Sequence, residues 1–292
     1  MTEPDWTNVA STWLRPLEKP AQIPESADVV IVGGGVAGIS TAWFLAKQGI
    51  NVVVCEKGHV AGEQSGRNWG WVRVQGRDTR EIPMMLESLR IWERLEEDTG
   101  EDVGFVRRGC YFTARSQKEM QAAEDWLSIA DEYGIKSRLL SAAELRQHLG
   151  DSPVDWQGAL YTEADGRAEP QRAVPVIARA AERAGATVLK ACAVRGLETS
   201  GGAVSAVITE HGSIKTSTVL CAAGAWSALF CRSLGIALPQ LKVRGTVART
   251  AACENVLDGN VFDELLGIRR REDGGYTIAH GTIIKHPITP ST

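Results

Sequence analysis

Three consecutive glycines after a short apolar run constrain this sequence more than any other feature. Asp28–Val32 (DVVIV) is typical of a buried parallel strand, and the glycine-rich stretch Gly33–Gly38 follows it directly. Gly38–Gln48 has apolar residues at helical spacing and stops at Gly49, and Asn51–Cys55 (NVVVC) is a second apolar run. A strand, a helix and a strand within about 30 residues predict a right-handed βαβ unit with parallel strands.

The glycines fit the pattern G-x-G-x-x-G, in which each glycine has its own structural role. Gly33 lets the chain turn off the strand, Gly35 lets the backbone approach a pyrophosphate, and Gly38 lets the helix pack closely on the strand. The helix N-terminus offers N–H groups and the positive end of its dipole to phosphates. We therefore predict that a dinucleotide diphosphate is bound by Gly33, Gly34, Gly35, Val36, Ala37 and Gly38.

An acidic residue follows the second strand of this unit. Glu56 lies 18 residues after Gly38, and its carboxylate can accept hydrogen bonds from the ribose hydroxyls of an adenosine. The same negative charge would repel a 2′-phosphate, which disfavours NADP. The pattern by itself leaves both FAD and NAD open as the dinucleotide.

Composition places the chain among ordinary globular proteins, with 43% hydrophobic and 23% charged residues among 292. At roughly 100–200 residues per domain, two domains are expected. The net charge of −4 argues against a nucleic-acid surface, and the sequence lacks an apolar run of about 18 residues that could cross a membrane. The six cysteines form no CxxC pair, so we expect free thiols and no metal site. A reducing, cytoplasmic compartment is predicted, with peripheral attachment to the inner membrane face left open.

The rest of the chain alternates predicted helices and short strands. Two helices begin with a capping box, at Ser116-x-x-Glu119 and at Ser141-x-x-Glu144. Residues 57–82 form a long connection without periodicity, which is typical of a functional segment. Further helices are expected over 83–98 and 170–184. Strands are expected over 103–106, 109–114, 159–162, 187–190, 194–198, 204–209, 213–216, 218–222, 241–250, 266–271 and 276–280.

Three segments carry a family resemblance. Val30–Lys57 is similar to the segment that binds the FAD adenosine in the D-amino-acid oxidase-like flavoproteins, the group of glycine, sarcosine and D-amino-acid oxidases and dehydrogenases. Ser65–Gly70 (SGRNWG) resembles the second flavin-binding segment of that family, and Cys221–Ser227 (CAAGAWS) resembles the turn that approaches the cofactor again. The resemblance implies FAD as the cofactor, bound, in addition to the glycine loop, by Glu56, Lys57, Ser65, Gly66, Arg67, Asn68, Gly70, Val194, Ala223, Gly224 and Trp226.

These residue types suit a flavin nucleotide. Glycines permit close backbone approach, Ser65 supplies a hydroxyl group and Arg67 supplies positive charge. Trp69 and Trp71 are compatible with two interpretations, packing between the domains or lining the flavin pocket.

The resemblance also implies the fold class, which is α/β at the cofactor and α+β overall. We expect a Rossmann-like FAD-binding domain over residues 28–80 and 159–235, preceded by an N-terminal arm over residues 1–27. A substrate domain, a mainly antiparallel sheet with helices, is expected over 81–158 and 236–292. In this family a further C-terminal stretch closes the flavin site, and we expect the present sequence to be a fragment that lacks it.

Two strands resemble those that cover the flavin in the substrate domain. They are Leu241–Arg249 and Ile268–Ala279, and they carry Arg244 and Arg269. A substrate carboxylate is best bound by a bidentate arginine, so these two residues are the substrate-binding candidates. A solvent-exposed strand face is the alternative interpretation for both. We assign no catalytic residue.

The implied activity is oxidation of an amine or amino acid at a C–N bond next to a carboxylate. Hydride passes to the flavin, and the resulting imine is hydrolysed by water. The electron acceptor, which could be oxygen, a quinone or a protein, is not specified by the sequence. A 2-hydroxy-acid substrate, a non-catalytic flavin- or nucleotide-binding subunit completed by another chain, and an NAD-binding module are the alternatives. A homo-oligomer is compatible with the sequence.

Overall fold

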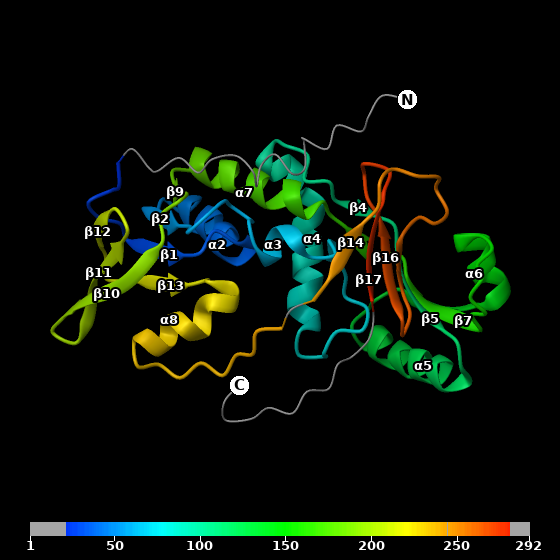
Figure 1. Ribbon diagram of the computed structural model, residues 1–292. Helices are drawn as coiled ribbons and strands as arrows, with labels where there is room; N and C mark the ends of the chain where they lie inside the picture. The colour runs from blue at the N-terminus through cyan, green and yellow to red at the C-terminus, as the bar shows by residue number, and fades with distance from the viewer. Residues whose placement is uncertain (1–21, 244, 281–292) are drawn as a thin grey trace. The chain divides into compact units, whose positions relative to one another are not determined.

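The computed structural model describes residues 22–243 and 245–280, and it contains two compact units (Figure 1). Among the described residues, the first unit holds 22–68, 95–103 and 170–243. The second unit holds 69–94, 104–169 and 245–280. Both units are therefore built from segments that are far apart in the sequence.

The first unit is built on a parallel sheet with the strand order β13-β1-β2-β9. The predicted βαβ unit is confirmed, because α2 (Val36–Ala46) connects β1 (Val29–Val32) to the adjacent parallel strand β2 (Val52–Cys55). The outer strands are β9 (Thr187–Leu189) and β13 (Val219–Cys221). Strands β1 and β2 are almost wholly apolar because both faces of this sheet are covered.

Helices cover one face of this sheet and a small second sheet covers the other. Helix α7 (Pro170–Arg183) packs against α2, and Pro170 occupies its first position, as expected for a residue without an N–H. On the opposite face, Val207 and Ile214 share a buried cluster with Val30 and Val53. The former pair belongs to a three-stranded antiparallel sheet formed by β10 (Val194–Ser200), β11 (Ala203–Thr209) and β12 (Gly212–Lys215).

The second unit contains a seven-stranded sheet with the order β14-β17-β16-β15-β5-β7-β6. All of its pairs are antiparallel except β15 with β5, which confirms the mainly antiparallel prediction. Its strands are β5 (Cys110–Ala114), β6 (Ser137–Ser141), β7 (Gly158–Thr162), β14 (Val247–Arg249), β15 (Asn260–Phe262), β16 (Leu266–Arg270) and β17 (Tyr276–His280).

Three helices bury the apolar faces of this unit. Residues of α4 (Ile82–Thr99) and α5 (Gln117–Glu132) form one core cluster with Leu160 of β7. Residues of α6 (Ala142–Leu149) form another with Tyr111 and its neighbours. A small sheet of β3 (Trp71–Val72), β8 (Gly166–Arg167) and β4 (Val106–Arg107) completes the unit.

The predicted domain boundaries differ from these two units. The sequence places 69–80 and 159–169 with the cofactor domain, whereas the structure places both in the second unit. The reason is strand pairing, since Gly158–Thr162 pairs with β5 and β6 rather than joining the parallel sheet. Residues 95–103 and 236–243, which the sequence places in the substrate domain, belong instead to the first unit. Of the predicted arm, 1–21 lie outside the described residues, and Ala27 belongs to the buried core of the first unit.

Both predicted capping boxes are formed, and they allow a stability prediction. The Ser116 hydroxyl accepts a hydrogen bond from the Glu119 N–H at 3.3 Å, and the Glu119 carboxylate accepts one from the Ser116 N–H at 3.0 Å. We expect Ser116→Ala to lower the free energy of unfolding by about 1 kcal/mol in urea denaturation. The control is Ser128→Ala, an exposed position inside the same helix, which should be neutral or stabilising by up to ~0.5 kcal/mol. Equal midpoints for the two variants would contradict the capping role.

Candidate cofactor site

The glycine loop joins β1 to α2 at the carboxyl end of the parallel sheet. Gly33 has a φ of 115°, and a Cβ atom there would overlap the carbonyl oxygen of Ala222, which follows β13. Only glycine allows both this backbone conformation and this close approach. Because β13 and β2 lie on opposite sides of β1, the loop lies at a switch point of the sheet, where open α/β sheets bind their ligands.

Close packing of helix on loop depends on Gly38. A Cβ atom there would overlap the Gly33 carbonyl oxygen and would lie 3.1 Å from Cγ2 of Ile31. Gly35 is the N-cap residue of α2 and supplies no side-chain cap. The first turn, at Val36 and Ala37, is exposed, so the helix N-terminus is available to a negatively charged group.

Glu56 faces the loop, as predicted. One carboxylate oxygen accepts a hydrogen bond from the Gly34 N–H at 2.7 Å, and the other accepts one from the Gly58 N–H at 2.7 Å. The side chain is buried, and its Cβ would lie 2.8 Å from a Cβ at Gly34. A carboxylate has about four acceptor positions, so two hydrogen bonds leave capacity for ribose hydroxyls.

Ser65 connects the second predicted flavin segment to the glycine loop. Its hydroxyl accepts a hydrogen bond from the Val36 N–H at 2.9 Å, and it would lie 3.1 Å from a Cβ at Gly35. Ser65 and Gly66 belong to the short helix α3 (Gln64–Arg67). Asn68 closes α3 by donating to the carbonyl oxygens of Gln64 and Ser65. A hydroxyl thus lies beside the helix N-terminus, where a diphosphate is expected.

Two predicted cations at the site are paired with one carboxylate. Glu63 forms ion pairs with Lys57 at 2.7 Å and with Arg67 at 3.5 Å. The Lys57 ammonium also lies 4.2 Å from the centre of the Trp226 ring, and Lys242 lies 4.4 Å from it. Trp226 ends the short 3-10 helix Gly224–Trp226, so the turn after β13 carries an indole held by two lysines.

Val194 begins β10 and packs against the core cluster of the first unit. The chain just before it is tied to the end of β2, because the Cys192 N–H donates to the Glu56 carbonyl oxygen at 2.8 Å. Ala191 similarly donates to the Gly58 carbonyl oxygen at 3.2 Å. The first unit therefore brings together the loop, Glu56, Ser65, the Trp226 turn and the Val194 strand, and the cofactor contacts of these residues remain predictions.

Gly70 and the two tryptophans belong to the second unit. Trp69 and Trp71 contact each other edge to face with ring centres 5.1 Å apart, and both lie near Phe262. Gly70 has a φ of 76°, and a Cβ atom there would lie 3.0 Å from the guanidinium carbon of Arg269. The contacts of these three residues that the structure gives lie within this unit. Their roles toward a flavin stay predictions.

The two substrate candidates have different outcomes. Arg244 lies outside the described residues. Arg269 is not on a solvent-exposed face, since its side chain is 2% exposed, and it pairs with the Glu169 carboxylate at 2.8 and 3.3 Å. Pairing of both terminal nitrogens within the fold disfavours Arg269 as the primary ligand of a substrate carboxylate.

Sequence reasoning missed a group of buried polar residues around the turn at Asp165-Gly166. The Asp165 carboxylate accepts hydrogen bonds from the N–H groups of Val74 at 2.8 Å and Gln75 at 3.1 Å. It thereby holds the segment that follows the predicted flavin segment. The sequence offered only a turn signal here, because the partners lie about 90 residues earlier in the chain.

Asp165 should give folding a distinct pH dependence. Burial raises the pKa of its carboxyl from 3.8 to about 6, although the two N–H donors and Arg73 favour the ionised form. Between these values the folded chain binds more protons than the unfolded chain. Protonated Asp165 therefore stabilises the folded chain. This contribution to the free energy of unfolding is complete below pH 3.8, and up to about 3 kcal/mol of it is lost as the pH rises through about 6.

The measurement compares Asp165→Asn with the unchanged chain by urea denaturation from pH 4 to 7. The unfolding free energy of the unchanged chain minus that of Asp165→Asn should rise as the pH falls. Asp78→Asn is the control, because Asp78 lies on the surface and its Arg80 partner lowers its pKa. A constant difference across this pH range would contradict the assignment for Asp165.

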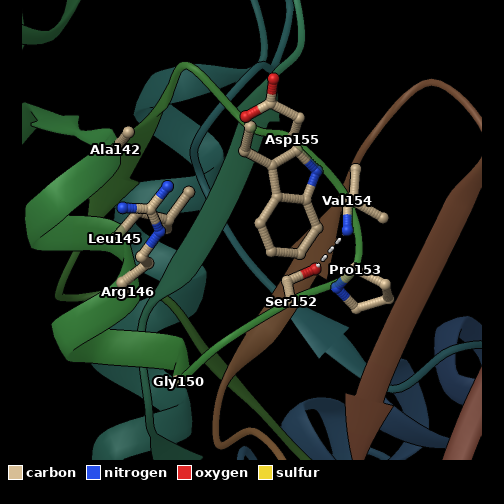
Figure 2. Close-up of a pocket in the computed structure, with 9 residues that line it drawn as sticks. Ala142, Leu145, Arg146, Gly150, Ser152, Pro153, Val154 and Asp155 are labelled. Atoms are coloured by element: carbon tan, nitrogen blue, oxygen red, sulfur yellow. Dashed lines mark hydrogen bonds between the residues drawn. The ribbon is translucent and has the colours of Figure 1, made fainter.

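A separate small cavity of about 140 Å³ lies in the second unit beside α6 (Figure 2). Ser152 and Val154 form part of its wall and are joined by a hydrogen bond of 3.0 Å. None of its lining residues belongs to the predicted cofactor set.

Within 22–243 and 245–280, no group of three or more His, Cys, Asp or Glu side chains is arranged for a metal ion. No helix in the same residues has the length and apolarity to span a bilayer.

The residues of the first unit fit a dinucleotide such as FAD. The loop leaves no room for Cβ atoms at Gly33 and Gly38, the N-terminus of α2 is exposed, and Glu56 retains acceptor positions. Together these features satisfy the requirements for a diphosphate and an adenosine ribose.

Comparison with known proteins agrees with this geometry. Residues 28–291 match the family described as FAD dependent oxidoreductase (DAO). Sarcosine dehydrogenase, mitochondrial, of Mus musculus is 31% identical over 264 residues, and the match covers 86% of this chain and 28% of that protein. Sarcosine oxidase subunit beta of Arthrobacter sp is 30% identical, with coverage of 78% and 57%. L-Amino acid deaminase from Proteus myxofaciens in complex with anthranilate superposes with a TM-score of 0.86 and 33% identity, covering 91% of this chain and 61% of that one.

The chain thus spans less than two thirds of the length of each of these three proteins. The family match is nevertheless nearly complete on the side of this chain, and it includes the whole glycine loop and the elements of both units. The protein therefore belongs to the DAO family of FAD-dependent oxidoreductases.

Proposed function

We propose that this protein takes part in the FAD-dependent oxidation of an amine or amino acid at a C–N bond next to a carboxylate. The observation that carries the proposal is the arrangement of the glycine loop, Glu56 and Ser65 at the exposed N-terminus of α2. Relatives named for sarcosine and for L-amino acids support this substrate class.

FAD would be held by the first unit. The N-terminus of α2 and the Ser65 hydroxyl would contact the diphosphate, and Glu56 would accept hydrogen bonds from the ribose. Gly33 and Gly38 would allow the close packing of the loop, β13 and α2 on which this geometry depends. When bound, FAD supplies the acceptor for a hydride, which carries two electrons and one proton.

The protein residues would bind and orient the substrate. A carboxylate-bearing substrate requires a cation, and an arginine is best suited because its donors form a planar fork. Arg244 stays a prediction for this role. The carboxylate would fix the neighbouring C–N bond, and exclusion of water would favour the neutral amine that the oxidation needs.

The test uses the full chain, purified and supplied with FAD. An absorbance spectrum before and after acid precipitation reports whether flavin is bound and whether the link is covalent. Sarcosine, several D- and L-amino acids and their 2-hydroxy-acid counterparts are then added without oxygen. Bleaching of the flavin band with release of ammonia or an amine is the expected result. Absence of flavin, or bleaching by hydroxy acids alone, would overturn the proposal.

A second candidate is a flavin-binding subunit that another chain completes. One relative is itself named as a subunit, sarcosine oxidase subunit beta. In that case the chain would bind flavin but would oxidise amines only after a partner is added. A partner chain, the electron acceptor and a reducing, cytoplasmic location remain proposals, and the free cysteines among the described residues support the last of these.

A further inference from the structure

Cysteine thiols meet in pairs in the first unit, and one of these pairs is accessible to solvent. The Cys221 thiol at the end of β13 is in hydrogen-bonding contact with the Cys231 thiol of α8 (Ser227–Ser233), and both residues are only half-buried. Cys55 and Cys192 make a similar contact, but these residues are 2% and 0% exposed. Because an oxidant reaches a thiol from solvent, the pair Cys221–Cys231 is the one open to redox chemistry.

The contact between these two thiols follows from a reversal of the chain after β13. Residues 224–226 form the short 3-10 helix, and α8 begins at the next residue and lies alongside β13 (Figure 1). Gln240 fixes this reversal, because its amide nitrogen donates to the Gly224 carbonyl oxygen at 3.1 Å and its amide oxygen accepts from the Ala228 N–H at 3.2 Å. The backbone that carries the two thiols is therefore held by hydrogen bonds.

A bond between the two sulfur atoms would close a ring around residues 222–230. The enclosed members of the predicted cofactor set are Ala223, Gly224 and Trp226. Directly after Cys221, the Ala222 N–H donates to the Val32 carbonyl oxygen at 2.9 Å, and the Ala222 carbonyl oxygen lies where a Cβ atom of Gly33 would be. The ring would thus be anchored at the glycine loop and would contain the turn that approaches it.

We propose that Cys221 and Cys231 form a redox modification site, at which hydrogen peroxide joins the two thiols in a disulfide that locks α8 to β13. A thiolate sulfur attacks one peroxide oxygen and breaks the O–O bond, which gives a sulfenic acid and one water. The second thiol attacks the sulfenic sulfur, forms the S–S bond and releases a second water. The two sulfurs together lose the two electrons that reduce the peroxide, and a small thiol reverses the reaction by exchange.

The two thiols would have different roles in this reaction. Desolvation raises the pKa of the Cys231 thiol, and the neighbouring Cys221 raises it further. Since the thiolate is the nucleophile, Cys221 would attack the peroxide and Cys231 would resolve the sulfenic acid. In Cys231→Ser, dimedone should therefore label a sulfenic acid on Cys221. In Cys221→Ser, labelling of Cys231 should be at least about threefold weaker.

Closing the ring should slow the release of FAD. A cross-link restricts the motions by which the Trp226 turn could separate from the glycine loop, and such restriction lowers the cost of holding a ligand. We expect the oxidised chain to release FAD at least about threefold more slowly than the reduced chain. This effect rests on the proposed function, whereas formation of the disulfide does not.

The experiment uses the full chain purified with FAD and treated with hydrogen peroxide. Free thiols are then blocked, and peptide masses identify the cross-links. The return of flavin fluorescence after dilution measures FAD release. The variants are Cys221→Ser and Cys231→Ser, with Cys253→Ser as the matched control because Cys253 is exposed and lies in the second unit. Thermal unfolding checks that each variant is folded, and the buried pair Cys55–Cys192 is an internal control in every sample.

The expected product is a Cys221–Cys231 peptide pair that is lighter than the two separate peptides by two hydrogen atoms. It should form in the unchanged chain and in Cys253→Ser, and dithiothreitol should remove it and restore the faster FAD release. Peroxide treatment that leaves both thiols free, or that cross-links Cys55 to Cys192 equally fast, would overturn the inference. A disulfide that leaves FAD release unchanged would overturn the lock. If the chain binds no FAD, the proposed function fails, and the peptide masses still decide whether the disulfide forms.

Discussion

Replacing Gly38 by alanine should yield a chain that purifies without FAD and is strongly destabilised. The added Cβ would overlap the Gly33 carbonyl oxygen and crowd Ile31, so α2 would have to move away from β1. Overlap with backbone is not relieved by a side-chain rotation, and we expect a loss of about 3 kcal/mol or more in unfolding free energy. Flavin absorbance per chain and the urea midpoint measure the two effects.

Gly49→Ala is the control for this prediction. Gly49 ends the same helix with a φ of 77°, but a Cβ atom there would meet nothing within 4 Å. Its cost should be limited to the strained backbone, about 1 kcal/mol, with flavin content unchanged. If the two alanine variants have the same urea midpoint and the same flavin content, the close approach of α2 to the loop at Gly38 is not required for folding or FAD binding.

Glu56→Gln is expected to weaken FAD binding by ~10- to 100-fold. The carboxylate accepts hydrogen bonds from Gly34 and Gly58 with both of its oxygens, and an amide would oppose one of these N–H groups with its own donor. It would also lose a charge-assisted hydrogen bond to the ribose, and such bonds contribute about 1.5–3 kcal/mol. Equilibrium titration of the flavin-free chain with FAD, followed by fluorescence, gives the dissociation constants.

Glu63→Gln is the matched control in the same neighbourhood. Glu63 pairs with Lys57 and Arg67, but its side chain is 40% exposed. Exposed ion pairs contribute about 0–1 kcal/mol, so FAD affinity should change less than about fivefold. A larger loss for Glu63→Gln than for Glu56→Gln would mean that the cations near the site, rather than the acid after β2, determine binding.

The local elements that carry these predictions could be read from sequence because their signals lie within a few residues. The βαβ unit follows from apolar runs around Gly33–Gly38, and the cap of α5 follows from Ser116 and Glu119. Placement of Glu56 at the loop also follows, because parallel strands bring their carboxyl ends to the same edge. No long-range information was needed for these features.

Strand partners and buried ion pairs could not be read in this way. Gly158–Thr162 has the pattern of a strand, but nothing in that pattern specifies β5 and β6 as its neighbours. Arg269 was predicted to face a substrate or solvent, and Glu169, 100 residues earlier, pairs with it instead. Periodicity indicates which face of a helix or strand is apolar, but it does not indicate which other segment of the protein packs against that face.

The sequence by itself therefore determined the dinucleotide loop and its acid, because both belong to one βαβ unit of about 30 residues. It also determined the family of the chain, because the motifs that carry the resemblance are continuous in the sequence. Only the tertiary structure decided the limits of the two units, the Asp165 contact with Val74 and Gln75, and the pairing of Arg269 with Glu169. These depend on segments separated by tens of residues or more, whose meeting is fixed by packing of the whole unit rather than by local preference.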